Sequence, residues 1–247
     1  MRRFYPEGLA EVCVRTERRR EWIASTAWLD CVPGTDAIEP HQAMVWIAAL
    51  NGRTPLFTTH PRAPGARDAE KTYWAGNATP PRCWLHDGIV AVHYPPGGGG
   101  AADFTHAHFP TTAFHSWTRE GRWWCAAQGE AYAALACSGP THMTEQGPWA
   151  GCELIAPGRG HAWMAVFGSR ERDGDFAAFC ARCASAEMIG PDGGVGVELR
   201  LGETRLLLPP SGPPVVNGAP EDFAAWPQME SPLWHAEFGQ TELRLRE

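Results

Sequence analysis

RWWCAAQGEAYAALAC, the stretch from Arg122 to Cys137, contains two apolar runs that are separated by only two residues, Gly129-Glu130. A two-residue connection that begins with glycine suits a tight β-hairpin, because glycine readily adopts the positive φ that such a turn needs. The stretch therefore predicts two antiparallel strands, within Arg122–Gln128 and Ala131–Cys137.

Four further turn signals of this kind divide the apolar runs of the chain. Asn-Gly and Asp-Gly pairs supply positive φ in tight hairpins, and Gly-X pairs suit the alternative tight turn. The four pairs are Asn51-Gly52, Asp87-Gly88, Gly202-Glu203 and Gly239-Gln240. Beyond the last pair, Leu243 and Leu245 alternate with charged residues, as in a half-buried strand. These signals together predict an all-β fold, a large antiparallel β-sandwich.

One segment, near 174–188, has helical periodicity instead. Phe176, Phe179, Cys180 and Cys183 recur at the spacing of a single helix face. Asp173 is the expected N-cap. We expect this one inserted helix to pack its aromatic stripe on a sheet. Because both cysteines fall on the same stripe, they are expected to be buried thiols rather than zinc ligands.

The length of 247 residues suits a single β-sandwich domain over 1–247, with a core that needs no metal or disulfide to stabilise it. Twelve tryptophans indicate a heavy core or indole platforms that stack on sugar rings. Eight scattered cysteines are more typical of reduced, buried thiols than of a disulfide framework.

The formal net charge of −7 makes nucleic acid a poor candidate partner, because nucleic-acid surfaces are normally basic. No apolar run approaches transmembrane length, and no secretory signal is visible. We therefore expect no membrane partner and a cytoplasmic location by default. An incomplete N-terminus would favour a secreted or periplasmic protein instead.

A histidine cluster offers one possible site. His106 and His108 share one face of a predicted strand, where two imidazoles can chelate a metal. Their spacing from Gly100 matches the first half of the cupin metal motif, and the stretch ending at His161 resembles the second half, one residue out of register. The acidic ligand expected after His108 is missing. The alternatives are a single divalent metal on His106, His108 and His161, or no cofactor and two polar residues on a sheet face.

A second candidate site contains Trp74, Asn77 and Arg82 in a turn-rich stretch. An apolar ring, an amide and a bidentate donor together suit the recognition of a polyol or a carboxylate. The competing interpretation is structural: Trp74 fills the core while the two polar side chains bind backbone groups.

An ordered series of motifs resembles the heparinase II/III-like polysaccharide-active proteins. The series spans roughly 41–239 and comprises His60-Pro61, Trp74-Ala75-Gly76-Asn77, Pro81-Arg82, Thr105-His106-Ala107-His108-Phe109-Pro110, Phe114, Gly129, Tyr132, Ala134, Leu135, Gly151, Glu153-Leu154, Pro157-Gly158-Arg159, Asp173-Gly174, Phe176, Phe179 and Phe238-Gly239. The resemblance covers the C-terminal β-sandwich region of that family. The family's N-terminal α/α toroid has no counterpart in this chain, and His108 stands where an aromatic residue is expected.

This resemblance implies a protein that binds or acts on polysaccharide or oligosaccharide, often one containing uronic acid, as a lyase, as a hydrolase or without catalysis. His106 and Tyr132 would be acid and base in a lyase, and Glu153 would serve a hydrolase. Trp74, Asn77, Arg82 and Arg159 would contact substrate. A further possibility is a non-catalytic domain that docks a partner α/α toroid chain.

Overall fold

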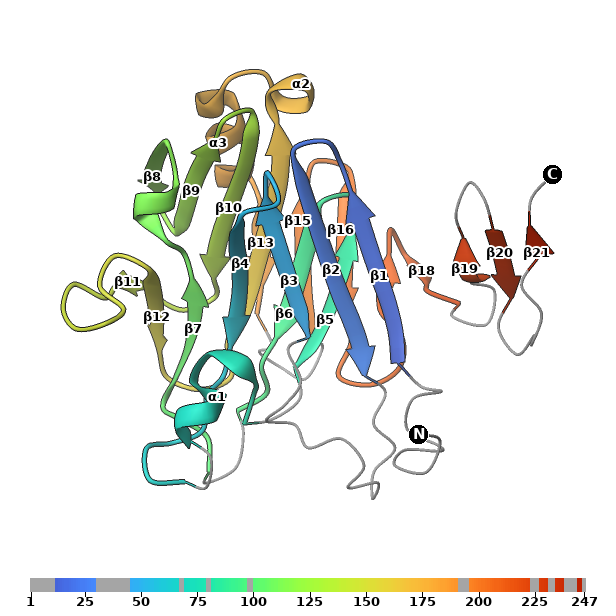
Figure 1. The fold of residues 1–247 in the computed structure, drawn as a ribbon. Coiled ribbons are helices and arrows are strands. Elements are labelled where there is room, and N and C mark those ends of the chain that lie inside the picture. The colour runs from blue at the N-terminus through green and yellow to red at the C-terminus, as the bar shows by residue number, and fades with distance from the viewer. Residues whose placement is uncertain are drawn as a thin grey trace.

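The computed structural model describes residues 12–29, 45–66, 69–78, 81–96, 100–190, 196–222, 227–230, 234–237 and 244–245. Every strand pair in this part of the chain is antiparallel. The predicted all-β antiparallel sandwich is confirmed (Figure 1).

Four sheets account for the strands. The seven-stranded sheet has the order β1 (Val12–Arg18), β2 (Trp22–Leu29), β3 (Trp46–Leu50), β4 (Thr54–Thr59), β7 (Phe104–His108), β12 (Glu153–Pro157), β11 (His142–Met143). The six-stranded sheet has the order β5 (Arg82–His86), β6 (Ile89–His93), β13 (Ala162–Ser169), β10 (Ala131–Cys137), β9 (Trp123–Gln128), β8 (Ser116–Glu120).

Two smaller sheets follow in the chain. The five-stranded sheet has the order β14 (Glu187–Ile189), β15 (Val197–Leu201), β16 (Thr204–Leu208), β17 (Val215–Val216), β18 (Ala219–Pro220). The three-stranded sheet has the order β19 (Pro227–Glu230), β20 (Trp234–Glu237), β21 (Arg244–Leu245). The described helices are α1 (Ala69–Ala75), α2 (Arg170–Asp173), α3 (Phe176–Ala184) and a 3-10 turn, Thr111–Ala113.

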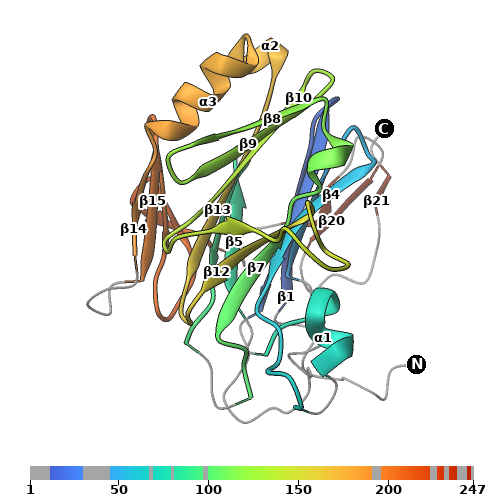
Figure 2. The ribbon, with the colours of Figure 1, turned by 90° about the vertical axis from the view of Figure 1, so that its left-hand side faces the viewer.

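The six-stranded sheet is the middle layer of three (Figure 2). One of its faces packs on the seven-stranded sheet and buries residues such as Trp46, Leu56 and Leu135. Its other face packs on the five-stranded sheet and α3, around residues such as Trp84 and Phe179. The molecule therefore has two hydrophobic cores, one on each side of a central sheet.

Double burial explains the composition of the central strands. Every residue of β10 and of β13 is buried, so neither strand alternates between apolar and polar residues. A strand that is covered on both faces has no position left for a solvated side chain. The alanines of β10 keep the layers close, while Trp163 and Phe167 of β13 fill the first core.

The turns formed as their residue types predicted. Asn51 and Asp87 adopt φ values of 48° and 47°, followed by Gly52 at 66° and Gly88 at 73°. Gly129-Glu130 joins β9 to β10, and Gly202-Glu203 joins β15 to β16. The predicted turn at Gly239-Gln240 and the strand residue Leu243 lie outside the described residues.

The inserted helix is confirmed, with corrected ends. Its N-cap is Asp175, whose side chain accepts a hydrogen bond from the Ala178 amide at 2.8 Å, and not Asp173. Asp173 instead closes α2 and pairs with Arg182 of α3 at 2.7 Å. The helix ends at Ala184, and β14 occupies the end of the predicted range. Phe179 and both cysteines of the apolar stripe are buried, as expected.

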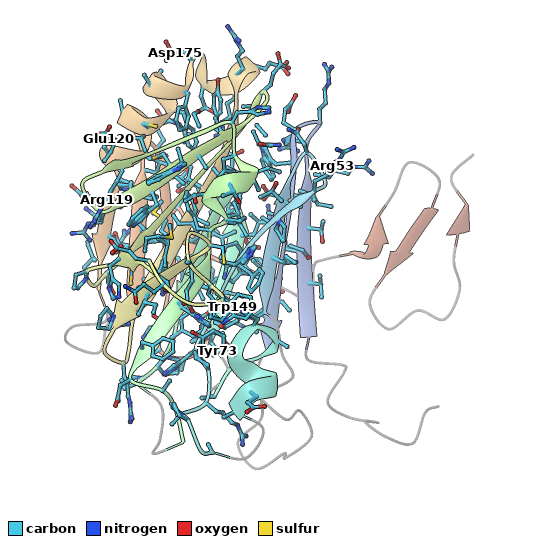
Figure 3. All side chains as sticks on the ribbon, turned by 60° about the vertical axis from the view of Figure 1, so that its left-hand side comes forward. Arg53, Tyr73, Arg119, Glu120, Trp149 and Asp175 are labelled. Atoms are coloured by element: carbon cyan, nitrogen blue, oxygen red, sulfur yellow. The ribbon has the colours of Figure 1, made fainter. Side chains whose placement is uncertain are left out.

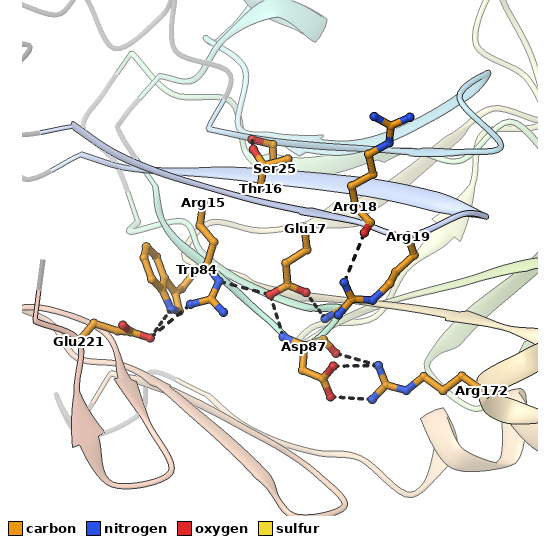
Figure 4. Close-up of polar contacts among 11 residues, drawn as sticks. Arg15, Thr16, Glu17, Arg18, Arg19, Ser25, Trp84, Asp87, Arg172 and Glu221 are labelled. Atoms are coloured by element: carbon orange, nitrogen blue, oxygen red, sulfur yellow. Dashed lines mark hydrogen bonds and ion pairs between the residues drawn. The ribbon is translucent and has the colours of Figure 1, made fainter. Parts of the chain in front are cut away.

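A carboxylate clamp connects the first strand to the middle layer (Figure 4). Glu17 of β1 accepts hydrogen bonds from the backbone amides of Asp87 and Gly88, at 2.9 and 2.7 Å. Both terminal nitrogens of Arg172 in turn donate hydrogen bonds to the Asp87 carboxylate, at 2.7 and 3.1 Å. One hairpin turn is thereby attached to β1 and to α2.

None of the helices in the described ranges is both long and apolar enough to span a membrane. The six cysteines with described side chains are all free thiols.

We expect Gly168→Ala to destabilise the fold, because a methyl group there would overlap the Asp173 carboxylate and approach the Phe179 ring to 2.8 Å. Overpacking of this kind costs about 1–3 kcal/mol of unfolding free energy. Urea denaturation measures the cost. Gly100→Ala is the matched control, because nothing lies within 4 Å of its added carbon. Equal stability of the two variants would contradict the packing of α3 on β13.

Candidate functional site

A buried acid–imidazole pair joins the neighbouring strands β7 and β12. Glu153 pairs with His108 in the ladder, and His106 lies two residues further along the same face. The His106 Nδ1 approaches the Glu153 Oε1 to 2.6 Å. Both side chains are almost completely buried.

Three donors surround the Glu153 carboxylate. His106 is the first, and the Tyr73 hydroxyl donates to the same oxygen at 2.6 Å. Thr144 donates to Oε2 at 2.7 Å. Burial alone would raise the pKa of Glu153, but these hydrogen bonds outweigh it and hold the pKa below its usual value. Glu153 is therefore an ionised carboxylate at neutral pH.

The second nitrogen of His106 also faces oxygen atoms. Nε2 lies 2.7 Å from the Tyr73 carbonyl and 2.5 Å from the Thr59 hydroxyl, which itself donates to that carbonyl. Both ring nitrogens of His106 therefore lie within hydrogen-bond distance of protein oxygen atoms. His106 and Glu153 form a buried, hydrogen-bonded acid–imidazole pair.

An aromatic surface, which we call the platform, covers this acid–imidazole pair. It consists of Tyr73 and Trp74 from α1 and Trp149 from the loop before β12. The Trp74 ring stacks on the His106 imidazole, with centroids 4.1 Å apart and planes at 11°. The rings of Trp149 and Tyr73 are nearly parallel, with centroids 6.1 Å apart (Figure 3). The Trp149 ring lies edge-on to that of Trp74, with centroids 5.4 Å apart.

The platform is accessible at its outer edge. Trp149 is 38% exposed, and Tyr73 and Trp74 are half-buried. The loop that presents Trp149 is held closed by the Gly151 amide, which donates to the Thr144 carbonyl at 2.9 Å. The buried indole nitrogen of Trp74 has no hydrogen-bond partner within the described structure.

The structure therefore brings together three of the residues predicted to be functional: Trp74, His106 and Glu153. Arg159 lies beyond the end of the same β7–β12 ladder and pairs with Asp103 at 2.7 Å on the surface.

Three other predicted residues lie away from this group. Tyr132 belongs to the second core, where it packs on Phe176 and Phe179 and donates to the Gly174 carbonyl. Asn77 is buried and accepts the His60 amide at 2.9 Å. Arg82 lies 4.4 Å above the Trp28 ring and donates to the carbonyls of Pro210 and Gly212. For Asn77 and Arg82 these contacts agree with the structural interpretation.

The three histidines of the metal alternative do not converge. His161 bonds through Nδ1 to Thr105, whose side chain points to the opposite face of β7 from His106. His108 stacks on Phe57 and bonds to the Pro55 carbonyl at 2.8 Å, and burial lowers its pKa. No group of three metal-binding side chains occurs among the residues that the structure describes.

Tyr73, Thr144 and Trp149 complete the site but were not predicted. Trp149 carried one usable signal, since it is an aromatic residue inside the turn-rich run Gly147-Pro148-Trp149 and so is poorly placed to join a core. The hydroxyl contacts of Tyr73 and Thr144 depend on tertiary placement alone.

No protein-family model, curated protein or solved structure matches this chain.

We expect Glu153→Gln to lower the unfolding free energy by about 3 kcal/mol at pH 7, because a neutral amide replaces the charged acceptor of several buried hydrogen bonds. The lowered pKa of Glu153 means that its stabilisation is complete above about pH 4.5 and is lost as the pH falls through the folded value. The difference between variant and wild type should therefore shrink in acid. Urea denaturation between pH 7 and pH 3 measures it, with the exposed Glu145→Gln as control. A difference that grows in acid would contradict an ionised Glu153 in the folded protein.

Proposed function

We propose that the chain is a polysaccharide-binding β-sandwich protein and that the platform of Tyr73, Trp74 and Trp149 is its binding surface. The observation that carries the proposal is the exposed Trp149 ring, held parallel to Tyr73. Flat aromatic rings at a surface suit the apolar faces of sugar rings. The motif series resembling heparinase II/III-like proteins, in which Trp74, His106 and Glu153 take part, supports the same ligand class.

The acid–imidazole pair beneath the platform serves to hold it in place. The His106 imidazole stacks under the Trp74 ring, with ring centroids 4.1 Å apart. The Tyr73 carbonyl and hydroxyl are both fixed, by His106 and Glu153 respectively. Two consecutive aromatic residues of the short helix α1 are thus locked to the sheet before a ligand arrives, which reduces the ordering cost of binding.

The arrangement favours binding over proton transfer. A catalytic base needs a nitrogen or oxygen within reach of the substrate, whereas both nitrogens of His106 are occupied by protein acceptors. Burial and the hydrogen bond to Glu153 raise the pKa of Tyr73, so its hydroxyl stays protonated at neutral pH. The unpartnered indole N–H of Trp74 is a donor that a sugar oxygen could satisfy after a small displacement.

We expect Trp149→Ala to weaken binding of the cognate oligosaccharide at least about tenfold, because exposed aromatic anchors often carry more than 1.4 kcal/mol of binding free energy. A panel of neutral and uronate-containing oligosaccharides, followed by isothermal titration calorimetry, identifies the ligand and measures the loss. Trp117→Ala is the matched control, since Trp117 is 46% exposed on β8, in the other large sheet. An equal loss in both variants, or wild-type protein that binds no oligosaccharide, would refute the proposal.

A second candidate function is docking of a partner α/α toroid chain. The outer face of the seven-stranded sheet supports it, because Val14, Ile23 and Ile47 are exposed there by 59%, 36% and 42%. Co-expression with a toroid chain encoded in the same genome tests it. Ile47→Glu should abolish co-purification while leaving oligosaccharide binding intact. If the Ile47→Glu variant co-purified with the toroid chain as well as the wild type does, the docking surface would lie elsewhere.

A further inference from the structure

Three cysteines from two elements meet in the second core. Cys125 lies on β9 and faces α3, where Cys180 and Cys183 occupy the buried side of the helix. The Cys125 thiol lies close enough to both of the others for each to shift its pKa. All three are free thiols, and all belong to one continuous apolar cluster.

One of the three thiols borders a surface hollow. The hollow measures about 400 Å³, lies between β8 and α3, and is lined by Thr118, Glu120, Phe176, Ala177, Cys180, Ala181 and Ala184. Figure 3 shows Glu120 on the side of the molecule that α3 covers. Cys180 is 5% exposed, whereas Cys125 and Cys183 are fully buried. A small reagent in the hollow therefore reaches Cys180 first.

We propose that this hollow is a thiol–disulfide exchange site, at which a small-molecule disulfide oxidises Cys180 and Cys125 to an internal disulfide. In the first step the Cys180 thiolate attacks one sulfur of the reagent, forming a mixed disulfide and releasing one thiolate. In the second step the Cys125 thiolate attacks the Cys180 sulfur and displaces the second thiolate. Two protein protons are transferred to the two released thiolates, so one disulfide is reduced for each one formed.

The other buried thiols provide the contrast. Cys83 is fully buried and directs its sulfur to the carbonyls of Ala27 and Val45. Cys137 lies in the first core beside Ser138. Neither is in contact with a second thiol in the described structure, so neither has a partner that could resolve a mixed disulfide.

The surroundings make the reaction slow at neutral pH. Burial, Cys125 and Glu120 raise the pKa of Cys180 to about 12, and Cys183, burial and Glu120 raise that of Cys125. Only the thiolate attacks a disulfide, so the rate should rise about tenfold for each unit of pH between 7 and 10. A site of this kind responds to sustained oxidising conditions and not to brief exposure.

The disulfide would connect the third layer covalently to the central sheet. It would join β9 to α3 and close a loop of about 55 residues, which removes conformational entropy from the unfolded chain. We expect the midpoint of thermal unfolding to rise by roughly 5 °C or more in the oxidised protein.

The experiment treats the full chain with bis(2-hydroxyethyl) disulfide at pH 8.5 and maps the trapped products by peptide mass spectrometry. We expect a Cys125–Cys180 disulfide and Cys83 left reduced, while the partly exposed Cys152 reacts separately and ends as a mixed disulfide. Cys125→Ser should stop at a mixed disulfide on Cys180, Cys180→Ser should leave Cys125 reduced, and Cys183→Ser should form the same disulfide as wild type. Each variant is first checked for folding by circular dichroism, and Cys125→Ala replaces a serine variant that fails.

Three results would overturn the proposal: no reaction at Cys180 after prolonged incubation, a stable mixed disulfide at Cys180 in the wild type, or a disulfide involving Cys183 in place of Cys125. Oligosaccharide binding does not enter this test, so its outcome is independent of the proposed function.

Discussion

The two central strands of the middle sheet have no solvated face, and the rest of the structure depends on that constraint. Every residue of β10 and β13 is buried, so both surfaces of the sheet must be covered by apolar side chains from elsewhere. The seven-stranded sheet covers one surface, and the five-stranded sheet with α3 covers the other. Apolar burial on both sides is the main source of stability available to a chain with few ion pairs in its interior. Loss of either covering layer would expose one surface of the middle sheet to water.

Local features of this architecture could be read from the sequence, and long-range features could not. The turns at Asn51-Gly52 and Asp87-Gly88 depend on backbone conformations that only a few residue types adopt readily, so the residues themselves reveal them. The stripe of α3 is equally local. The third layer could not be predicted. A strand such as β10 is a run of small apolar residues whether one face of its sheet is covered or both are. The short helix α1 has too few residues for a periodicity to be visible.

The candidate functional site shows the same difference between local and long-range features. His106 and Glu153 each stood out as residues capable of acid–base chemistry, yet their pairing depends on the register between β7 and β12, strands separated by more than forty residues. Tyr132, which a motif series placed beside them, lies in the second core because its side chain points from β10 toward α3. The order of motifs along a sequence does not reveal which face of which sheet a side chain occupies. For His106 and Glu153, that information comes from the pairing of β7 with β12.

The two sites proposed for this protein use the layered structure in opposite ways. The platform lies on the outer face of the seven-stranded sheet, where the buried His106–Glu153 pair fixes α1 and leaves Trp149 exposed. The thiols lie between the middle sheet and α3, where burial suppresses ionisation and the hollow beside Cys180 admits a reagent. Because a complete core separates the two positions, oxidation of the thiols has no direct contact through which to alter the platform. We therefore expect the oxidised protein to be more stable and to bind oligosaccharide with unchanged affinity.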